Sequence, residues 1–421
     1  MVKVIPYENE KVDTISPLSI CLLNNATVIP LMLGSTPKVI KGGVNHPAMD
    51  EKFHQYRGAA INKRQAEPDL ATDVDFIMSF NRNFFSSRGN FVYGGPIISN
   101  FGHFLAECIH RCWAYEFTEE KLELKVNKVL FIPQTNRSFS WLQAQKYQLP
   151  PVYLEILNYL GIPSNKVQCV FTPKTLKNLI VPQQASIFRS KQPITETYLQ
   201  FLDRCEVRNQ TVVHQPLYKK MYVSRRYFAL RGAYAGESYI EDFLQKNGFH
   251  IYYPEQHSIS SQLSMYKGAE EIIFAEGAAL HVLELLGHLD AHISVISRRS
   301  LSSDIFKPLL SSRVKSLSIM SEVETLPSLF FTKDNDKAAH GSAISILNVQ
   351  ALMSFLGTFH NLNISLFEPF TFSKNVKQDL NNYLTYYTNK ISTNESKKID
   401  ATIKFKLVFD KHFPKAKVRL V

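Results

Sequence analysis

A regular alternation of strand-like and helix-like segments fills residues 221–320 of this chain. The expected strands cover Met221–Ser224, Phe249–Tyr253, Glu271–Ala275, His292–Ile296 and Val314–Ile319, and the expected helices cover Ser238–Lys246, Ser258–Lys267 and Gly277–Leu286. Ser258 is the expected N-cap of its helix. Strands that alternate with helices of this length form parallel β-α-β units, because parallel neighbours need a crossover connection. The pattern predicts an α/β fold with a doubly wound parallel sheet.

Polar and small residues follow two of these expected strands. Ser224, Arg225 and Arg226 follow the first strand, with Arg231 a few residues later, and Glu276-Gly277-Ala278-Ala279 follows the third. Ligands bind beside the carboxyl ends of strands in such sheets. A helix N-terminus with small side chains admits a phosphate, and arginines bind diphosphates through paired hydrogen bonds. We therefore expect a phosphate-binding site at these strand ends.

The stretch from Gly94 to Glu107 joins a strand-like run to a helix-like run. It contains glycines at 94, 95 and 102, Asn100, His103 and Glu107. Glycines let the backbone turn tightly or approach a ligand. His103 and Glu107 are four residues apart, so they share one face of a helix near its start. The pattern is typical of a general base and its orienting partner. A Gly-rich turn before an amphipathic helix, with a merely hydrogen-bonded histidine, is the structural alternative.

These two regions together resemble glycosyltransferase family 61, whose bacterial members include capsule and surface-polysaccharide enzymes. The resemblance covers roughly residues 90–300, and its ordered motifs together are fairly specific. Its pieces are Gly94-Gly95 through Asn100-Phe-Gly-His103-Phe-Leu-Ala-Glu107, Tyr222-Val-Ser-Arg225-Arg226, Arg231, Glu237, Pro254-Glu255 before Gln262, and Ile272-Ile-Phe-Ala-Glu-Gly277-Ala278-Ala-Leu280.

The resemblance implies a GT-B-like architecture, with two facing Rossmann-like domains and a cleft between them. It implies a nucleotide-sugar donor, inversion at the anomeric carbon, no cofactor and usually no essential metal. Transferred to this chain, it implies donor contacts from Ser224, Arg225, Arg231, Glu237, Gly277, Ala278 and His281, and an acceptor-side loop with Gly95 and Asn100.

The chain departs from the family pattern at two positions. Many members have His-Gly-Ala where this chain has Glu276-Gly277-Ala278, and an Asn-Glu pair is common where this chain has Gly236-Glu237. A family histidine at position 276 is therefore excluded here, which leaves Glu276 or His281 to take its role. Glu237 is open to two interpretations, since it either accepts sugar hydroxyls or only complements the start of a helix.

Chain length and charge agree with such an enzyme. The 421 residues suit two domains with extensions. The net charge of +11 favours anionic partners, namely a nucleotide sugar, an anionic polysaccharide or lipid-linked acceptor, and an acidic membrane surface near the basic tail. No recognised nucleic-acid module accompanies the charge, so we expect no nucleic-acid partner. An odd set of five scattered cysteines indicates reduced thiols.

The organisation expected from the sequence has four parts. Residues 1–206 form an N-terminal α/β domain on the acceptor side, 207–220 a linker, 221–335 a Rossmann-like nucleotide-sugar domain, and 336–421 an extension that crosses back to the first domain. A helix is expected over Ile346–Leu356 of this extension. The N-terminal region shows no apolar run of the kind found in signal peptides or anchors. We therefore expect a bacterial enzyme in the cytoplasm, peripheral to the inner face of the membrane.

Two patterns raise the question of a bound metal ion. Asp73-Val-Asp75 has the D-x-D spacing of metal-dependent glycosyltransferases, although a solvated strand face explains it as well. His281, Glu284 and His288 stand at i, i+3 and i+7, but leucines surround them and Gly287 ends the expected helix. The sequence prediction is therefore that no metal is bound.

The function predicted from the sequence is transfer of a sugar to a hydroxyl of a capsule or lipopolysaccharide acceptor. The base is His103 or Glu107, and Glu276 at its strand end is the rival. One competing hypothesis is a non-catalytic nucleotide- or polysaccharide-binding protein of the same fold. A Rossmann-type oxidoreductase is another, but no G-x-G-x-x-G follows an expected strand.

Overall fold

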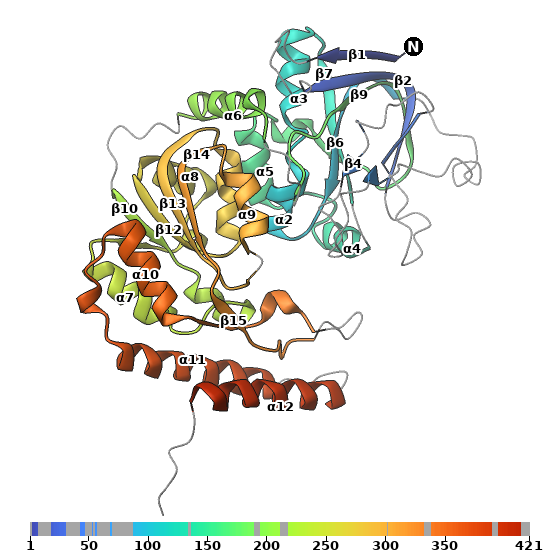
Figure 1. The fold of residues 1–421 in the computed structure, drawn as a ribbon. Helices are drawn as coiled ribbons and strands as arrows, with labels where there is room; N and C mark the ends of the chain where they lie inside the picture. Colours follow the sequence, from blue (N-terminus) through green and yellow to red (C-terminus); the bar gives the residue numbers. More distant parts are fainter. Residues whose placement is uncertain are drawn as a thin grey trace, which may run out of the picture.

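The computed structural model describes residues 2–6, 18–30, 43–46, 53, 55–56, 68–69, 87–133, 136–188, 194–210, 218–300, 302–331, 338–389 and 395–413. Two sheet-centred units lie side by side, and two long C-terminal helices run along the second unit (Figure 1). The Asp73–Asp75 motif and the end of the basic tail lie outside the described residues.

Five parallel strands form the sheet of the second unit. They are β10 (Lys220–Val223), β11 (His250–Tyr252), β12 (Glu271–Ala275), β13 (Leu289–Ile296) and β14 (Val314–Met320). Each adjacent pair is parallel, which confirms the predicted sheet. Ile272, Ile273 and Phe274 of β12 are fully buried, as expected for a strand covered on both faces.

The spatial order of these strands is β11-β10-β12-β13-β14. Numbered along the chain this is 2-1-3-4-5, so the winding direction reverses between β10 and β12. Ligands of doubly wound proteins bind in the crevice at such a reversal, beyond the carboxyl ends of the two strands. The topology therefore directs attention to the residues that follow Val223 and Ala275.

The connections contain helices α7 (Glu237–Lys246), α8 (Ile259–Gly268) and α9 (Ser302–Leu310). Ser258 caps α8 as predicted, since its hydroxyl accepts a 3.2 Å hydrogen bond from the amide of Ser261. The helix expected over 277–286 is instead the 3₁₀-helix η7 (Ala278–Leu285). The guanidinium of buried Arg313 donates to the carbonyls of Leu283 and Leu286, which stabilises the tight end of this helix.

The first unit is built on a mixed sheet. Its order is β1-β2-β9-β6-β7-β8, with β3 paired to β2. The strands are β1 (Val2–Pro6), β2 (Ser19–Ile29), β3 (Gly43–Asn45), β6 (Ser87–Ile97), β7 (Val126–Pro133), β8 (Val167–Cys169) and β9 (Lys174–Pro182). The four strands from β9 to β8 are parallel, whereas β1, β2 and β3 pair antiparallel. The N-terminal unit therefore departs from an all-parallel Rossmann sheet at one edge.

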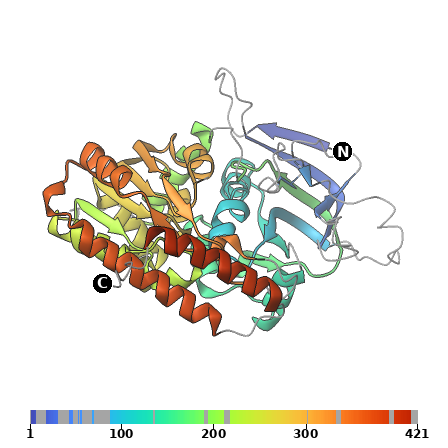
Figure 2. The same cartoon turned by 60° about the horizontal axis from the view of Figure 1, so that its bottom comes forward.

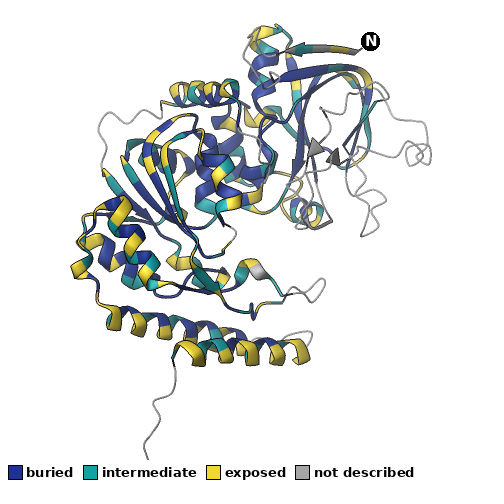
Figure 3. Cartoon of the chain, viewed as in Figure 1, coloured by how far each residue is buried: buried dark blue, intermediate teal, exposed yellow. Residues whose placement is uncertain are grey.

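The two units share one hydrophobic core. A continuous cluster of buried side chains includes Phe104 and Tyr198 from the first unit and Leu280 and Phe306 from the second. Helix α5 (Pro151–Tyr159) contacts α8, and the segment after β6 contacts η7. Figure 3 shows buried residues on the elements of both units where the units meet. The expected linker begins inside helix α6 (Glu196–Arg208), which runs past residue 207.

The C-terminal extension packs on the second unit. Helices α10 (Val349–His360) and α11 (Pro369–Thr388) contribute Leu352, Phe372, Val376 and Leu380 to a core that also contains Tyr234, Ile240 and Phe243. Helix α12 (Glu395–His412) lies along α11 (Figure 2). In the described residues, these contacts replace the expected crossing back to the first domain.

The predicted boundary between residues 335 and 336 separates two paired strands. Strand β15 (Val323–Thr325) pairs antiparallel with β16 (Ser345–Leu347), and Asn348 caps α10 directly after β16. The expected helix over Ile346–Leu356 therefore begins three residues later, because Ser345–Leu347 complete this small sheet. The described part of the chain contains no helix long and apolar enough to cross a membrane.

Two leucines on the C-terminal helices provide a matched test of this packing. Leu380 on α11 is fully buried, whereas Leu407 on α12 is 66% exposed. We expect Leu380→Ala to lower the free energy of unfolding by about 2–5 kcal/mol, because it removes buried methyl groups and leaves a cavity. Leu407→Ala is the control and should change it little. Urea unfolding measures both, and equal effects of the two substitutions would contradict the shared core.

Candidate functional site

The candidate site lies where the segment after β6 meets η7. This segment is one continuous helix, formed by α2 (Phe101–His103) and the π-helical η2 (Phe104–Cys108). Asn100 caps it, since its side-chain oxygen accepts a 3.1 Å hydrogen bond from the His103 amide. Asn100, which was predicted to line the acceptor loop, therefore fixes the start of the helix that carries His103.

His103 and Glu107 form the pair that the sequence predicts. The Nδ1 atom of His103 lies 2.6 Å from a carboxylate oxygen of Glu107. The histidine side chain is 49% exposed, whereas that of Glu107 is 10% exposed. A carboxylate at Nδ1 holds the proton on that nitrogen and leaves Nε2 as the acceptor. The geometry fits a base at His103 with Glu107 as its orienting group.

Gly102 permits close contact between the two units. A Cβ atom at this position would lie 3.3 Å from the Cβ of Ala278 and 3.3 Å from Cδ2 of His281. A side chain here would push the helix of His103 away from η7. Gly95 lies at a register shift within β6, and its φ of +99° is strained for other residues.

A buried cluster of two histidines and a carboxylate crosses the junction. His281 of η7 places Nδ1 2.6 Å from one oxygen of Glu284, and His110 of the first unit places Nε2 3.3 Å from the other oxygen. Burial favours a raised pKa for Glu284, but the hydrogen bonds from His110 and His281 outweigh it and lower this pKa to about 2. Glu284 is therefore a fixed negative charge that links the two units.

Phe188 brings the two histidine pairs together. Its ring stands edge-on to both His103 and His281, with centroid distances of 5.7 and 5.8 Å. The exposed His103 and the nearly buried His281 therefore flank one aromatic ring. Together with Gly102, this contact defines one face of a site assembled from both units.

Arg225 occupies the crevice at the reversal of the second sheet. It follows β10, and a Cβ atom added to Gly277, after β12, would lie 2.8 Å from its NH1 atom. Its Nε donates a 2.7 Å hydrogen bond to the Gly232 carbonyl. Burial lowers the pKa of Arg225, against the opposing pull of Glu237 and Glu276. The two predicted strand ends are therefore adjacent, with a partly buried cation between them.

Glu237 supports the loop that carries Arg225. One of its oxygens accepts hydrogen bonds from the Arg225 amide, the Tyr222 hydroxyl and the Ser224 hydroxyl, at 2.7, 3.0 and 3.3 Å. Ser224 also donates a 2.5 Å hydrogen bond to Glu241. In the described structure Ser224 and Glu237 are thus bound to each other, and their role at the strand end is to hold the loop.

Glu276 has an unfavourable environment for a base. It is fully buried, and its oxygens accept hydrogen bonds from the amide of Arg298 and the side chains of Arg299 and Ser302. Burial alone would raise its pKa, but the charges of Arg299 and Arg298 lower it. The carboxylate is therefore weakly basic, and its position explains a structural role in holding the segment after β13.

The remaining predicted donor residues are arranged differently. Gly277 lies beside Arg225, and Ala278 lies beside Gly102. The side chain of Arg231 is exposed at the end of the 3₁₀-helix η5 (Arg226–Arg231). Arg231 contributes its carbonyl to Arg225, at 3.3 Å, so its backbone belongs to the same loop.

The structure does not bring together the three residues of the possible metal site, His281, Glu284 and His288. His281 and Glu284 are in contact, but His288 pairs with Asp203 of α6, at 2.6 Å. Within the described residues, no group of three or more His, Cys, Asp or Glu side chains is arranged to hold a metal ion. All five cysteines are free, and burial raises the pKa of Cys108 and Cys112, which fits small core side chains.

Sequence reasoning missed His110, Phe188 and the arginine pair Arg298 and Arg299. His110 lies seven residues after His103, at a helical spacing that two turns of helix bring to one face. Phe188 follows β9 in an irregular segment and carries no pattern. Their partners lie about 90 to 170 positions away in the chain, so only the tertiary contacts could reveal them.

The fold places the chain among α/β proteins that bind ligands where a parallel sheet reverses its winding. Comparison with protein families then gives a specific relation. Residues 101–284 match the family model Glycosyltransferase 61, so this region is similar to that glycosyltransferase family. The match begins at the helix of His103 and ends at Glu284, so it contains both sides of the junction. The comparison with curated proteins found no match.

Substitution of Glu284 tests the link across the junction. The folded pKa of about 2 lies below the unfolded value of about 4.3, so ionised Glu284 stabilises the fold above pH ~4.3 and this contribution is lost as the pH falls toward 2. We expect Glu284→Gln to cost about 3–5 kcal/mol near neutral pH, as for a broken buried pair, and less below pH ~4.

Thermal and urea unfolding at several pH values measure this difference. The exposed Glu270, which pairs with Lys219 at the surface, provides the matched control. Glu270→Gln should have little effect throughout. A difference between wild type and Glu284→Gln that is constant from pH 2 to pH 7 would contradict the assignment.

Proposed function

We propose that the protein is an inverting glycosyltransferase that moves a sugar from a nucleoside-diphosphate donor to a hydroxyl group of a surface polysaccharide. The main support for the proposal is the contact between the helix of His103 and η7. It places the His103–Glu107 pair of the first unit beside η7 of the second, within the region matched by the family. A GT-B-like arrangement, with donor and acceptor bound from opposite units, is part of the proposal.

His103 acts as the general base in this mechanism. The acceptor hydroxyl oxygen attacks the anomeric carbon as the bond from that carbon to the diphosphate oxygen breaks. The hydroxyl proton passes to Nε2 of His103, and Glu107 stabilises the resulting charge through Nδ1–H. A single displacement of this kind inverts the configuration at the anomeric carbon. The exposure of His103 supports its role, because the acceptor must reach it.

The leaving diphosphate is neutralised by protein groups. Arg225 lies at the reversal of the parallel sheet, where its guanidinium occupies the space that a side chain at Gly277 would need and is placed to meet a phosphate. Exposed Arg231 on the same loop supplies a second cation. Preorganised donors of this type stabilise the charge that develops in the transition state. This assignment makes the reaction independent of a divalent metal.

His281 holds the opposite side of the reacting centre. Its Nδ1 is bound to Glu284, so Nε2 is the nitrogen available to a substrate. His281 packs against Gly102 and Phe188, which fixes its ring. We propose that it positions the donor sugar, while the basic surface of the chain favours an anionic capsule or lipopolysaccharide acceptor at the inner face of the membrane.

Substitution of either member of the His103–Glu107 pair tests the base. We expect His103→Ala or Glu107→Ala to lower the rate of transfer about 10²–10⁴-fold. The double substitution should be little worse than the poorer single one, because the two act as a unit. Steady-state rates with a radiolabelled nucleotide sugar measure the effect, and calorimetry should show unchanged nucleotide affinity.

His288 supplies a matched control for that experiment. It also contacts a carboxylate at 2.6 Å, and its side chain is 47% exposed, but its partner is Asp203 outside the junction. His288→Ala should retain near-normal transfer. If His103→Ala also retains it while Glu276→Gln abolishes it, the base lies in the second unit.

The donor assignment predicts weaker nucleotide binding after loss of the loop arginines. Arg225→Ala and Arg231→Ala should each cost about 1.5–3 kcal/mol of binding free energy, as for a hydrogen bond to a charged group. Arg204→Ala, which removes a half-exposed arginine of α6 that pairs with Glu116, is the control. Titration calorimetry with nucleoside diphosphates measures all three, and unchanged affinity in both loop variants would remove these arginines from the site.

Metal independence has its own test. Transfer should proceed at its full rate in excess EDTA, because protein cations neutralise the diphosphate. Complete loss of activity that manganese or magnesium restores would contradict the mechanism. It would instead support a metal held by the Asp73-Val-Asp75 motif.

A further inference from the structure

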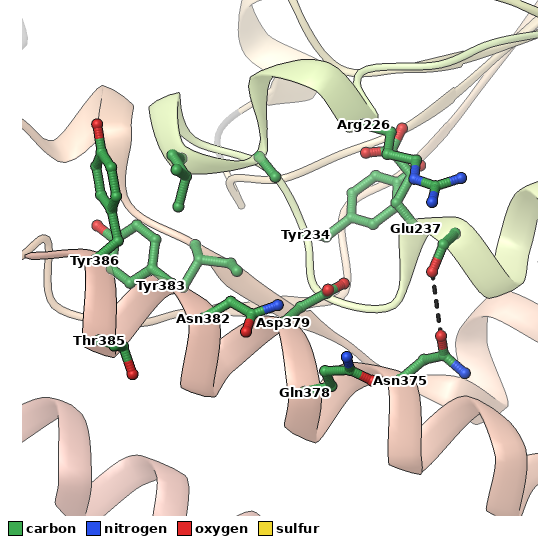
Figure 4. Close-up of a pocket in the computed structure, with 14 residues that line it drawn as sticks. Arg226, Tyr234, Glu237, Asn375, Gln378, Asp379, Asn382, Tyr383, Thr385 and Tyr386 are labelled. Atoms are coloured by element: carbon green, nitrogen blue, oxygen red, sulfur yellow. Dashed lines mark hydrogen bonds between the residues drawn. The ribbon is translucent and has the colours of Figure 1, made fainter.

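A separate cavity of 780 Å³ lies between η5, the start of α7 and α11 (Figure 4). This volume falls within the range of about 300–1,000 Å³ typical of small-molecule sites. One wall contains Arg226, Tyr234, Glu237 and Ser238. The other wall comes from α11, which lies outside the family match at 101–284. The cavity therefore combines a loop inside the matched region with a helix outside it.

One polar face of α11 forms the second wall. It presents Asn375, Gln378, Asp379, Asn382, Tyr383 and Tyr386. These positions recur at intervals of three and four residues, so they lie on one side of the helix. The neighbouring side is apolar and packs on the second unit, as the buried Phe372, Val376 and Leu380 show. The helix is thus amphipathic, and part of its polar side faces a cavity.

Glu237 provides an independent sign of a ligand. Its side chain is 3% exposed and lines the cavity, and one oxygen already accepts three hydrogen bonds. The other oxygen, Oε2, has no hydrogen-bond partner among the described residues. An unpaired buried carboxylate oxygen is costly, and a bound hydroxyl would satisfy it. Burial raises the pKa of Glu237 to about 7, so near neutral pH it both donates and accepts.

The charges of the lining exclude a phosphate-like occupant. Glu237 and Asp379 contribute carboxylates, and Asp379 is fixed by a 2.8 Å hydrogen bond from the Gly236 amide. Arg226 is the lining cation, but its NH1 is engaged by Glu241 at 3.0 Å. Ser238, Asn375 and the Tyr383 hydroxyl already form hydrogen bonds within the protein. The amides of Gln378 and Asn382 and the tyrosine rings are left to bind neutral hydroxyls and flat apolar faces.

We propose that this cavity binds a neutral sugar residue of the acceptor glycan. The inference rests on the proposed function and extends it, because it assigns acceptor specificity to α11. Glu237 connects the two sites, since it lines the cavity and also holds the amide of Arg225 in the donor loop. An acceptor chain bound here would be anchored away from the hydroxyl that reacts.

Saturation-transfer NMR with the full chain tests the proposal. The probes are methyl glycosides of glucose, galactose, mannose and N-acetylglucosamine, with methyl glucuronide as the anionic comparator. Wild type should show saturation of at least one neutral glycoside and none of the glucuronide. Asn382→Ala and Gln378→Ala should each lower the affinity for that glycoside roughly five-fold, as for the loss of one neutral hydrogen bond. Asn382→Trp, whose larger side chain fills the cavity, should abolish binding.

Asn381 provides the matched control, because it neighbours Asn382 on α11 and is likewise exposed but does not line the cavity. Asn381→Ala should bind like wild type, and melting temperatures verify that every variant is folded. Nucleoside diphosphate binding, measured by calorimetry, should be the same in all of them. Absence of glycoside binding, equal binding by Asn382→Trp, or loss of nucleotide binding in the cavity variants would each overturn the proposal.

The two proposals fail in different ways in this experiment. If nucleotide binding and His103-dependent transfer persist while the glycoside result is negative, the acceptor cavity is wrong and the enzyme assignment stands. If wild type binds no nucleoside diphosphate and transfers no sugar, the proposed function is wrong.

Discussion

The buried carboxylate of Glu284 is the interaction on which the arrangement of the two units depends. It accepts hydrogen bonds from His281 on its own helix and meets His110 across the junction. A buried charge is tolerated only when its partners hold it in place, so the carboxylate fixes both histidines. The same contact sets η7 against the helix of His103, since Gly102 leaves no side chain between them. Together with the shared hydrophobic core, this carboxylate therefore fixes both the relative position of the units and the geometry of the candidate site.

The second unit adds a separate set of buried charges around its strand ends. Glu276 binds Arg298 and Arg299, and Glu237 binds the loop of Arg225. These carboxylates hold arginines and amides at the reversal of the sheet, where ligands bind in this class of fold. Fixed donors need no reorganisation when negative charge develops on a leaving group. The acidic residues near the site are thus best explained as supports for its basic ones.

The C-terminal extension gives this unit a second surface. Helix α11 buries Phe372, Val376 and Leu380 against the sheet unit and turns amide and tyrosine side chains toward a cavity. One helix therefore contributes both to stability and to the proposed recognition of a sugar. This helix lies beyond the residues that match the family.

The sequence by itself determined the parallel sheet of 221–320, the capping of α8 by Ser258 and the pairing of His103 with Glu107. These features depend on periodicity and on neighbours a few residues apart, which a sequence displays directly. Only the tertiary structure decided that His110 meets Glu284, that Phe188 lies between two histidines, that Glu276 is enclosed by arginines and that α11 packs on the second unit. Those contacts join residues that are far apart in the chain. The burial of a polar side chain determines its chemistry, and no local sequence pattern indicates whether such a side chain is buried.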